Sequence, residues 1–108
     1  MTPQRGSLLI VDLDPTRGRE QSQRRPCIVV SAASIIAAQR YPVIVVLPVT
    51  GTLGLGDLYP VVQPFARGLA KPSIVLVDQI RAIDKVGVSG QMAPLPAADM
   101  QRVDEAPS

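Results

Sequence analysis

Arg24, Arg25 and Pro26 stand where a polar loop meets an apolar run, and they are the residues of this chain best suited to phosphate chemistry. Proline can open a strand and holds the preceding residue extended, so we expect Arg25 at a strand entrance. A guanidinium group binds phosphate through two parallel hydrogen bonds and stabilises charge that develops during phosphoryl transfer. Arg25 is therefore either a phosphate clamp or a surface arginine paired with Glu20 or Asp14.

The loop that precedes this arginine pair, residues 14–23, brings more charge to the same rim. It contains Arg17, Arg19 and Glu20. Glu20 is the local candidate for a general base, and the alternative is that it only balances charge within an exposed loop.

Thr50 ends the apolar run from Val43 to Val49, one residue before a glycine. Its hydroxyl is expected at the rim of the sheet, where it either hydrogen-bonds a phosphate oxygen or starts a turn.

A second polar group, Asp78, Gln79 and Arg81, follows the apolar run from Ile74 to Val77. Ile80 and Ile83 are expected to supply the buried contacts of this stretch. The polar side chains form either an Asp–Arg ion pair that closes the fold or part of a site.

The amino-acid composition limits the kinds of metal site and catalysis that this protein can have. The chain has 108 residues and a formal net charge of +2; its 11 basic residues include two lysines, and it has one cysteine, no histidine and no tryptophan. Zinc sites of the usual kind and an intrachain disulfide are therefore excluded, no metal or cofactor is expected, and acid–base catalysis must proceed without imidazole. Cys27 is expected to be a small core residue.

Neither a membrane span nor a signal peptide is expected. The apolar runs are too short to cross a bilayer. Residues 1–5 lack the pattern of a signal peptide, a basic segment followed by an apolar one. We expect one soluble, cytoplasmic domain over residues 1–108.

The elements that must position these residues are mostly short strands. Branched aliphatic runs of strand length recur between turn residues, which favours a mainly β fold, a small closed or nearly closed antiparallel barrel. The runs are Leu8 to Leu13, Cys27 to Val30, Val43 to Val49 and Ile74 to Val77, with a weaker edge strand from Tyr59 to Gln63. Short helices are expected at Ala32 to Gln39 and Pro96 to Ala106, and the glycine-rich loop from Gly51 to Asp57 is either a lid or a plain connection.

Five motifs taken in order resemble the MazF/PemK (Kid) toxin family over nearly the whole chain. They are Arg5-Gly6, Val11 to Thr16 with Gly18 to Gln21, Arg25 to Ser31, Pro48 to Thr50, and Val75 to Lys85. The resemblance implies an SH3-like β-barrel that forms a homodimer. It implies a sequence-selective endoribonuclease that cuts single-stranded RNA without a metal. It also implies inhibition by a cognate MazE-like antitoxin whose disordered tail occupies the RNA groove, with DNA contacted only through the antitoxin complex.

The resemblance also assigns roles to individual residues. The family's catalytic arginine and threonine correspond to Arg25 and Thr50, Glu20 matches a glutamate important in some members, and Asp78 matches an acid–base residue of the Kid branch. Contacts with RNA are expected from Arg17, Arg19, Gln21, Gln79 and Arg81.

Two departures from the family pattern stand out. Leu76 occupies the position where Kid-like members carry a catalytic arginine, which favours the version built on Arg25 and Thr50. The sequence given ends at Ser108, whereas family members usually close with a longer apolar helix, so a shortened last helix and a weaker dimer or barrel are expected.

Two other functions stay open at this point. A CcdB-like gyrase poison shares the barrel but depends on a terminal Trp-Gly-Ile, and this chain has no tryptophan. A catalytically inert, antitoxin-binding relative is the other alternative.

Overall fold

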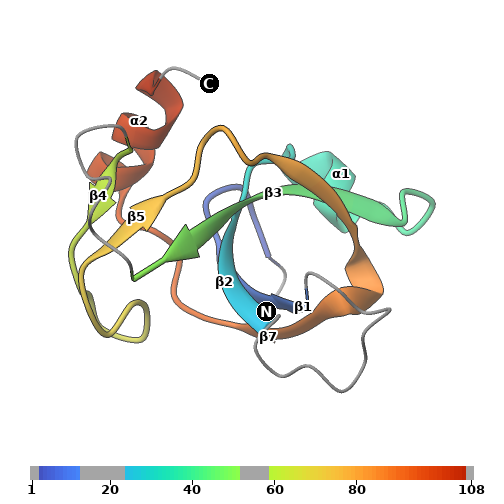
Figure 1. The fold of residues 1–108 in the computed structure, drawn as a ribbon. Coiled ribbons are helices and arrows are strands. Elements are labelled where there is room, and N and C mark those ends of the chain that lie inside the picture. Colours follow the sequence, from blue (N-terminus) through green and yellow to red (C-terminus); the bar gives the residue numbers. More distant parts are fainter. Residues whose placement is uncertain (1–2, 13–23, 52–58, 107–108) are drawn as a thin grey trace.

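The computed structural model describes residues 3–12, 24–51 and 59–106, and within them the chain forms one antiparallel sheet with two short α-helices (Figure 1). Seven strands pair in the order β4-β5-β3-β2-β1-β7, and β6 pairs with β3. The strands are β1 (Leu8–Asp12), β2 (Arg24–Val29), β3 (Val43–Thr50), β4 (Val61–Val62), β5 (Ser73–Val75), β6 (Arg81–Asp84) and β7 (Val88–Gln91). The helices are α1 (Ala33–Ala37), the 3-10 turn η3 (Lys85–Gly87) and α2 (Ala97–Glu105).

The expected mainly β architecture is confirmed, and β3 is its centre. β3 pairs with β6 from Val43 to Val46, with β2 up to Pro48, and with β5 at Val49 and Thr50. Between the described residues no ladder joins β6 to β7, so the strands curve into a barrel that stays open along one seam.

The central strands bury both of their faces, which explains their nearly uninterrupted apolar sequences. Alternate residues of β1, β2 and β3 enter two cores on opposite sides of the sheet. One core contains Leu8, Ile28, Leu47 and Val49 and extends to Val103 of α2. The other contains Leu9, Val11, Cys27, Val29 and Val46 and extends to Ile36 of α1.

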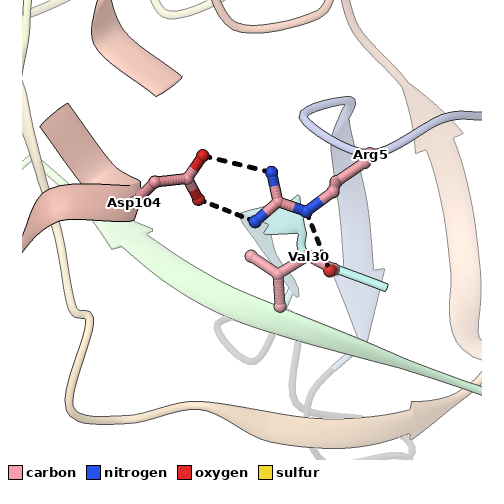
Figure 2. Close-up of polar contacts among 3 residues, drawn as sticks. All are labelled: Arg5, Val30 and Asp104. Atoms are coloured by element: carbon pink, nitrogen blue, oxygen red, sulfur yellow. Dashed lines mark hydrogen bonds and ion pairs between the residues drawn. The ribbon is translucent and has the colours of Figure 1, made fainter. Parts of the chain in front are cut away.

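The C-terminal helix α2 covers the first core next to β4 and β5 (Figure 1). Pro96 stands at its N-cap, close to the predicted start, and Val103 is its buried residue. Arg5 fixes its far end, as Figure 2 shows: the guanidinium donates to both carboxylate oxygens of Asp104, at 2.7 and 3.2 Å, and its Nε donates to the Val30 carbonyl at 3.2 Å. The helix is thus tied to the segments around β1 and β2.

Several details differ from the sequence prediction. β2 begins at Arg24, because its ladder with β1 includes Arg25 and Pro26; the strand expected over Ile74 to Val77 ends at Val75. β6 and β7 were not predicted, and Ile80, expected to be buried, is 56% exposed. Ile83 is buried as expected.

Two further expectations can be compared only in part. The weak edge strand is confirmed as the two-residue β4 at one end of the sheet. Most of the glycine-rich loop, residues 52–58, and Leu13 lie outside the described residues.

Neither of the two α-helices within the described ranges has the length and apolar character needed to cross a bilayer.

Candidate active site

Arg25 is an exposed residue inside the first half of β2, where it pairs with Val11. The β2–β3 ladder begins only at Cys27, so Pro26, which lacks an N–H group, lies where β3 offers no partner. In the described part of the chain no hydrogen bond or ion pair engages the Arg25 guanidinium. The backbone is therefore fixed while the charged group is accessible to a ligand.

Thr50 is the last residue of β3 and is half-buried. The β2–β3 register pairs Cys27 with Pro48, and continuing it by two residues sets Arg25 opposite Thr50 on the same face of the sheet. The ladder stops before that point, while Val49 and Thr50 pair with β5 along the opposite edge of β3. The two candidate catalytic residues thus stand on neighbouring strands just beyond the last formed pair.

Asp78 and Gln79 lie in the turn between β5 and β6, along the edge of β3 that faces away from β2. The Leu76 N–H donates to the Pro48 carbonyl at 2.9 Å, and the turn closes with the Gln79 N–H donating to the Leu76 carbonyl at 3.0 Å. Both polar side chains are exposed.

The carboxylate of Asp78 accepts a hydrogen bond from the Tyr59 hydroxyl at 3.0 Å, and this bond raises the pKa of Tyr59. The sequence suggested Arg81 as the partner in a structural ion pair. The recorded partner of Asp78 is instead a tyrosine that precedes β4, so the turn is joined to the other end of the sheet.

Arg81 lies opposite Val46, on the face of β3 that carries Thr50. Its charge and that of Arg25 both act on the buried Cys27 thiol: burial raises the pKa of Cys27 to about 11, and the two cations lower it by a smaller amount. Cys27 is fully buried and neutral at physiological pH, which confirms it as a core residue. Arg25, Cys27 and Arg81 lie on the same face of the sheet.

Next to this face a pocket of about 470 Å³ lies at the open seam of the barrel. It is lined by residues from the ends of β1 and β2 and from β6, η3 and β7, namely Asp12, Arg24, Arg81, Ala82, Ile83, Asp84, Val86, Gly87 and Ser89.

The structure thus gathers part of the predicted site. Arg25, Thr50 and Arg81 share one face, whereas Asp78 and Gln79 lie along the far edge of β3. The remaining predicted residues, Arg17, Arg19, Glu20 and Gln21, lie outside the described residues. In the described ranges, no three side chains of histidine, cysteine, aspartate or glutamate come together as a metal site would require.

Sequence reasoning missed three residues of this region, Tyr59, Asp84 and Ser89, and gave Arg24 no role separate from that of Arg25. Arg24 could have been proposed as a site residue, because it directly precedes Arg25 in the sequence. Asp84 and Ser89 carried no signal, because they meet only once β6 and β7 are formed.

Comparison with known proteins gives a consistent result. A family model described as the PemK-like, MazF-like toxin of type II toxin–antitoxin systems matches residues 4–106. Endoribonuclease EndoA of Bacillus subtilis (strain 168) is 32% identical over 108 residues, which cover 98% of this chain and 91% of that protein.

Solved structures agree in fold. The MazF structure (Form-I) from Deinococcus radiodurans has a TM-score of 0.74 at 27% identity and covers 96% of this chain and 91% of its own. The MazE-MazF structure (Form-II) from the same organism has a TM-score of 0.73 at 27% identity, with coverages of 95% and 89%.

Proposed function

The chain belongs to the PemK-like, MazF-like family of type II toxins, and on that premise we propose that it is an endoribonuclease that cuts single-stranded RNA, including mRNA, in a sequence-selective way. The observation that supports the proposal is the position of Arg25 and Thr50, which lie on the same face of the neighbouring strands β2 and β3, just beyond the last formed pair. Two such groups suit a phosphodiester held between neighbouring strands.

In the proposed reaction the ribose 2′-oxygen attacks the adjacent phosphorus while the bond from phosphorus to the 5′-oxygen breaks. The products are a 2′,3′-cyclic phosphate and a 5′-hydroxyl end. The Arg25 guanidinium stabilises the pentavalent phosphorane and protonates the leaving 5′-oxygen, and the Thr50 hydroxyl donates to a nonbridging oxygen.

The proton of the 2′-hydroxyl needs a different acceptor, because a guanidinium group stays protonated in proteins and is a poor base. We assign it to Glu20, with Asp78 as the second candidate. Asp78 keeps one carboxylate oxygen that the Tyr59 hydrogen bond does not use. Arg17, Arg19, Gln21, Gln79 and Arg81 supply the contacts with the RNA.

The proposal extends to partners and location. We propose that residues 1–108 act as one toxin domain, that two copies form a homodimer, and that a MazE-like antitoxin inhibits it, with DNA reached only through that complex. Support comes from the family match over residues 4–106 and from the relative solved as MazE-MazF. An mRNA substrate implies action in the cytoplasm.

The experiment is cleavage of a long RNA by the purified protein in EDTA, with analysis of the new ends. Cyclic phosphate and 5′-hydroxyl ends are expected. Arg25→Ala should lower the rate by about 10²- to 10³-fold, as loss of one donor to a developing oxyanion does. Arg40→Ala is the matched control, because Arg40 is an exposed arginine that lies over the Tyr41 ring.

Three results would contradict the proposal. A folded Arg25→Ala variant with full activity removes Arg25 from the mechanism. Intact RNA together with inhibited gyrase indicates a CcdB-like poison, and intact RNA with active gyrase indicates an inert relative.

A further inference from the structure

The pocket at the open seam of the barrel, called here the seam pocket, has a composition that no catalytic role explains. It lies where the free edges of β6 and β7 approach, and Asp12, Arg24, Asp84 and Ser89 supply polar groups from four different strands. Its volume of about 470 Å³ falls within the range of about 300 to 1,000 Å³ typical of small-molecule sites. The pocket is therefore large enough for a planar ring with attached groups.

Two opposite charges in the seam pocket have no partner among the residues that the structure describes. Neither the Arg24 guanidinium nor the Asp84 carboxylate makes a hydrogen bond or ion pair within the described residues. Asp84 occupies the N-cap position of η3, yet its side chain makes no capping hydrogen bond there. The usual structural reasons for an aspartate at this place are thus absent, and its carboxylate is available to accept hydrogen bonds from a ligand.

The pocket also has an apolar wall. Val86, in η3, is 93% exposed, the highest value among the exposed large hydrophobic residues of the described chain. Ile83 and Ala82 continue this surface from β6. An exposed aliphatic group beside polar side chains suits a ligand with a flat apolar face and a polar edge, which is the character of a nucleobase.

Arg81 connects the seam pocket with the proposed active site. It lines the pocket, and it lies on the face of the sheet that also carries Arg25 and Thr50. Arg24 lines the pocket as well but points to the face of β2 opposite to that of Arg25, so Arg81, which shares the face of Arg25, is the link between the two sites. A phosphate at Arg25 therefore leaves the base of a neighbouring nucleotide within reach of the pocket.

We propose that the seam pocket binds one nucleobase next to the scissile phosphate and that Asp84 selects bases bearing an exocyclic amino group. The inference rests on the proposed endoribonuclease function and adds a specificity-determining residue to it. An ionised carboxylate only accepts hydrogen bonds, and adenine, cytosine and guanine each present an amino donor. Uracil has no amino group, so Asp84 disfavours it at this position.

The test compares cleavage of one long RNA of mixed sequence by the wild type and by Asp84→Asn, with both sets of ends sequenced. The wild type is expected to disfavour uracil at one position beside the cut. The amide of asparagine donates as well as accepts, so the variant should cut uracil-containing sites about tenfold more often relative to the wild type. Preferences at other positions should stay the same.

Glu105→Gln is the matched control, since it removes one exposed carboxylate from α2, far from the seam pocket in sequence, and changes the net charge equally. Circular dichroism checks that each variant is folded. Asp84→Ala provides a second test, because it removes the acceptor without adding a donor and should weaken selection at the same single position.

The possible outcomes separate the inference from the function on which it rests. If both Asp84 variants cleave RNA with an unchanged sequence profile, the inference is overturned and the proposed function stands. An equal loss of cleavage rate at every site has the same meaning. Altered inhibition by an antitoxin with an unchanged profile assigns the pocket to a protein partner and also overturns it. Absence of cleavage by the wild type overturns both.

Discussion

Lys85 holds the C-terminal end of α1, and replacing it by methionine should destabilise the protein. The ammonium group of Lys85 donates to the carbonyl oxygens of Ile35 and Ala38, both at 2.8 Å. α1 has five residues, no side-chain hydrogen bond at its N-cap and no basic residue in its own last turn. Carbonyl groups at a helix end need partners from outside the helix, and a cation there also suits the helix dipole.

The size of the effect follows from these two bonds. A hydrogen bond to a charged group contributes about 1.5 to 3 kcal/mol. Lys85, Ile35 and Ala38 are half-buried, so water can replace part of each bond, and we expect a total loss of about 2 kcal/mol. For a domain of this size the melting temperature should fall by roughly 8 to 16 °C. Thermal and urea unfolding followed by circular dichroism at pH 7 measure both quantities.

Lys71→Met supplies the control, because Lys71 is the only other lysine and is exposed. This variant should unfold within about 0.5 kcal/mol of the wild type. Equal losses in the two variants would refute the reasoning, since they would show that the bonds to α1 add no stability.

Three further predictions concern the core, α2 and a turn. Burial raises the pKa of Cys27 from 9.0 to about 11, so the stability from the neutral thiol is complete below pH 9. It is lost as pH rises toward 11, at up to about 1.4 kcal/mol for each unit. Cys27→Ala should lack this slope in urea titrations, and parallel slopes would contradict the assignment. Alanine variants of Arg5 and Asp104, combined in a double-mutant cycle, should show a coupling of about 0.5 kcal/mol at pH 7, because both side chains are more than 40% exposed. The pKa of Asp104 is lowered by Arg5, so the coupling should persist as pH falls to 3.8 and disappear below it; a coupling that survives full protonation of the carboxyl would be inconsistent with an ion pair. Arg67 has a φ of 63°, so Arg67→Gly should keep the stability and Arg67→Val should lose about 1 to 2 kcal/mol in urea unfolding, whereas equal stabilities would show that the turn is not strained.

The sequence predicts the centre of the fold well because its strands bury both faces. β1, β2 and β3 are predicted from continuous apolar runs, and short runs of this kind are compatible with few structures other than buried strands. α2 was predicted from Pro96 and the polar stretch that follows it, to within a residue at each end.

β6 and β7 could not be predicted, because distant partners rather than their own residues make them strands. β6 contains one buried residue, Ile83, and β7 contains none. Their backbones are extended because they pair with β3 and β1. The polar stretch from Asp78 to Arg81 was accordingly interpreted as an insertion, although a strand begins at its last residue.

For the same reason, only those residues of the candidate site that local sequence marks could be predicted. Arg25 and Thr50 were found because a proline and a strand end mark them locally. Asp84 could not be recognised from the sequence. Its proposed role depends on lining one pocket with Arg24, which lies 60 positions earlier in the sequence and across the seam. Tyr59 was likewise not expected to reach Asp78, since that contact depends on how β4 and β5 pair.

The pairing of β1 with β7 has a consequence for synthesis of the protein. Leu9 lies beside Gln91, so the first strand of the sheet cannot complete its second ladder until Gln91 has left the ribosome. Contacts between such distant residues form late because the intervening chain must first lose its freedom. The nascent chain therefore completes its sheet, and with it any ability to cut RNA, only after residue 91 has been translated.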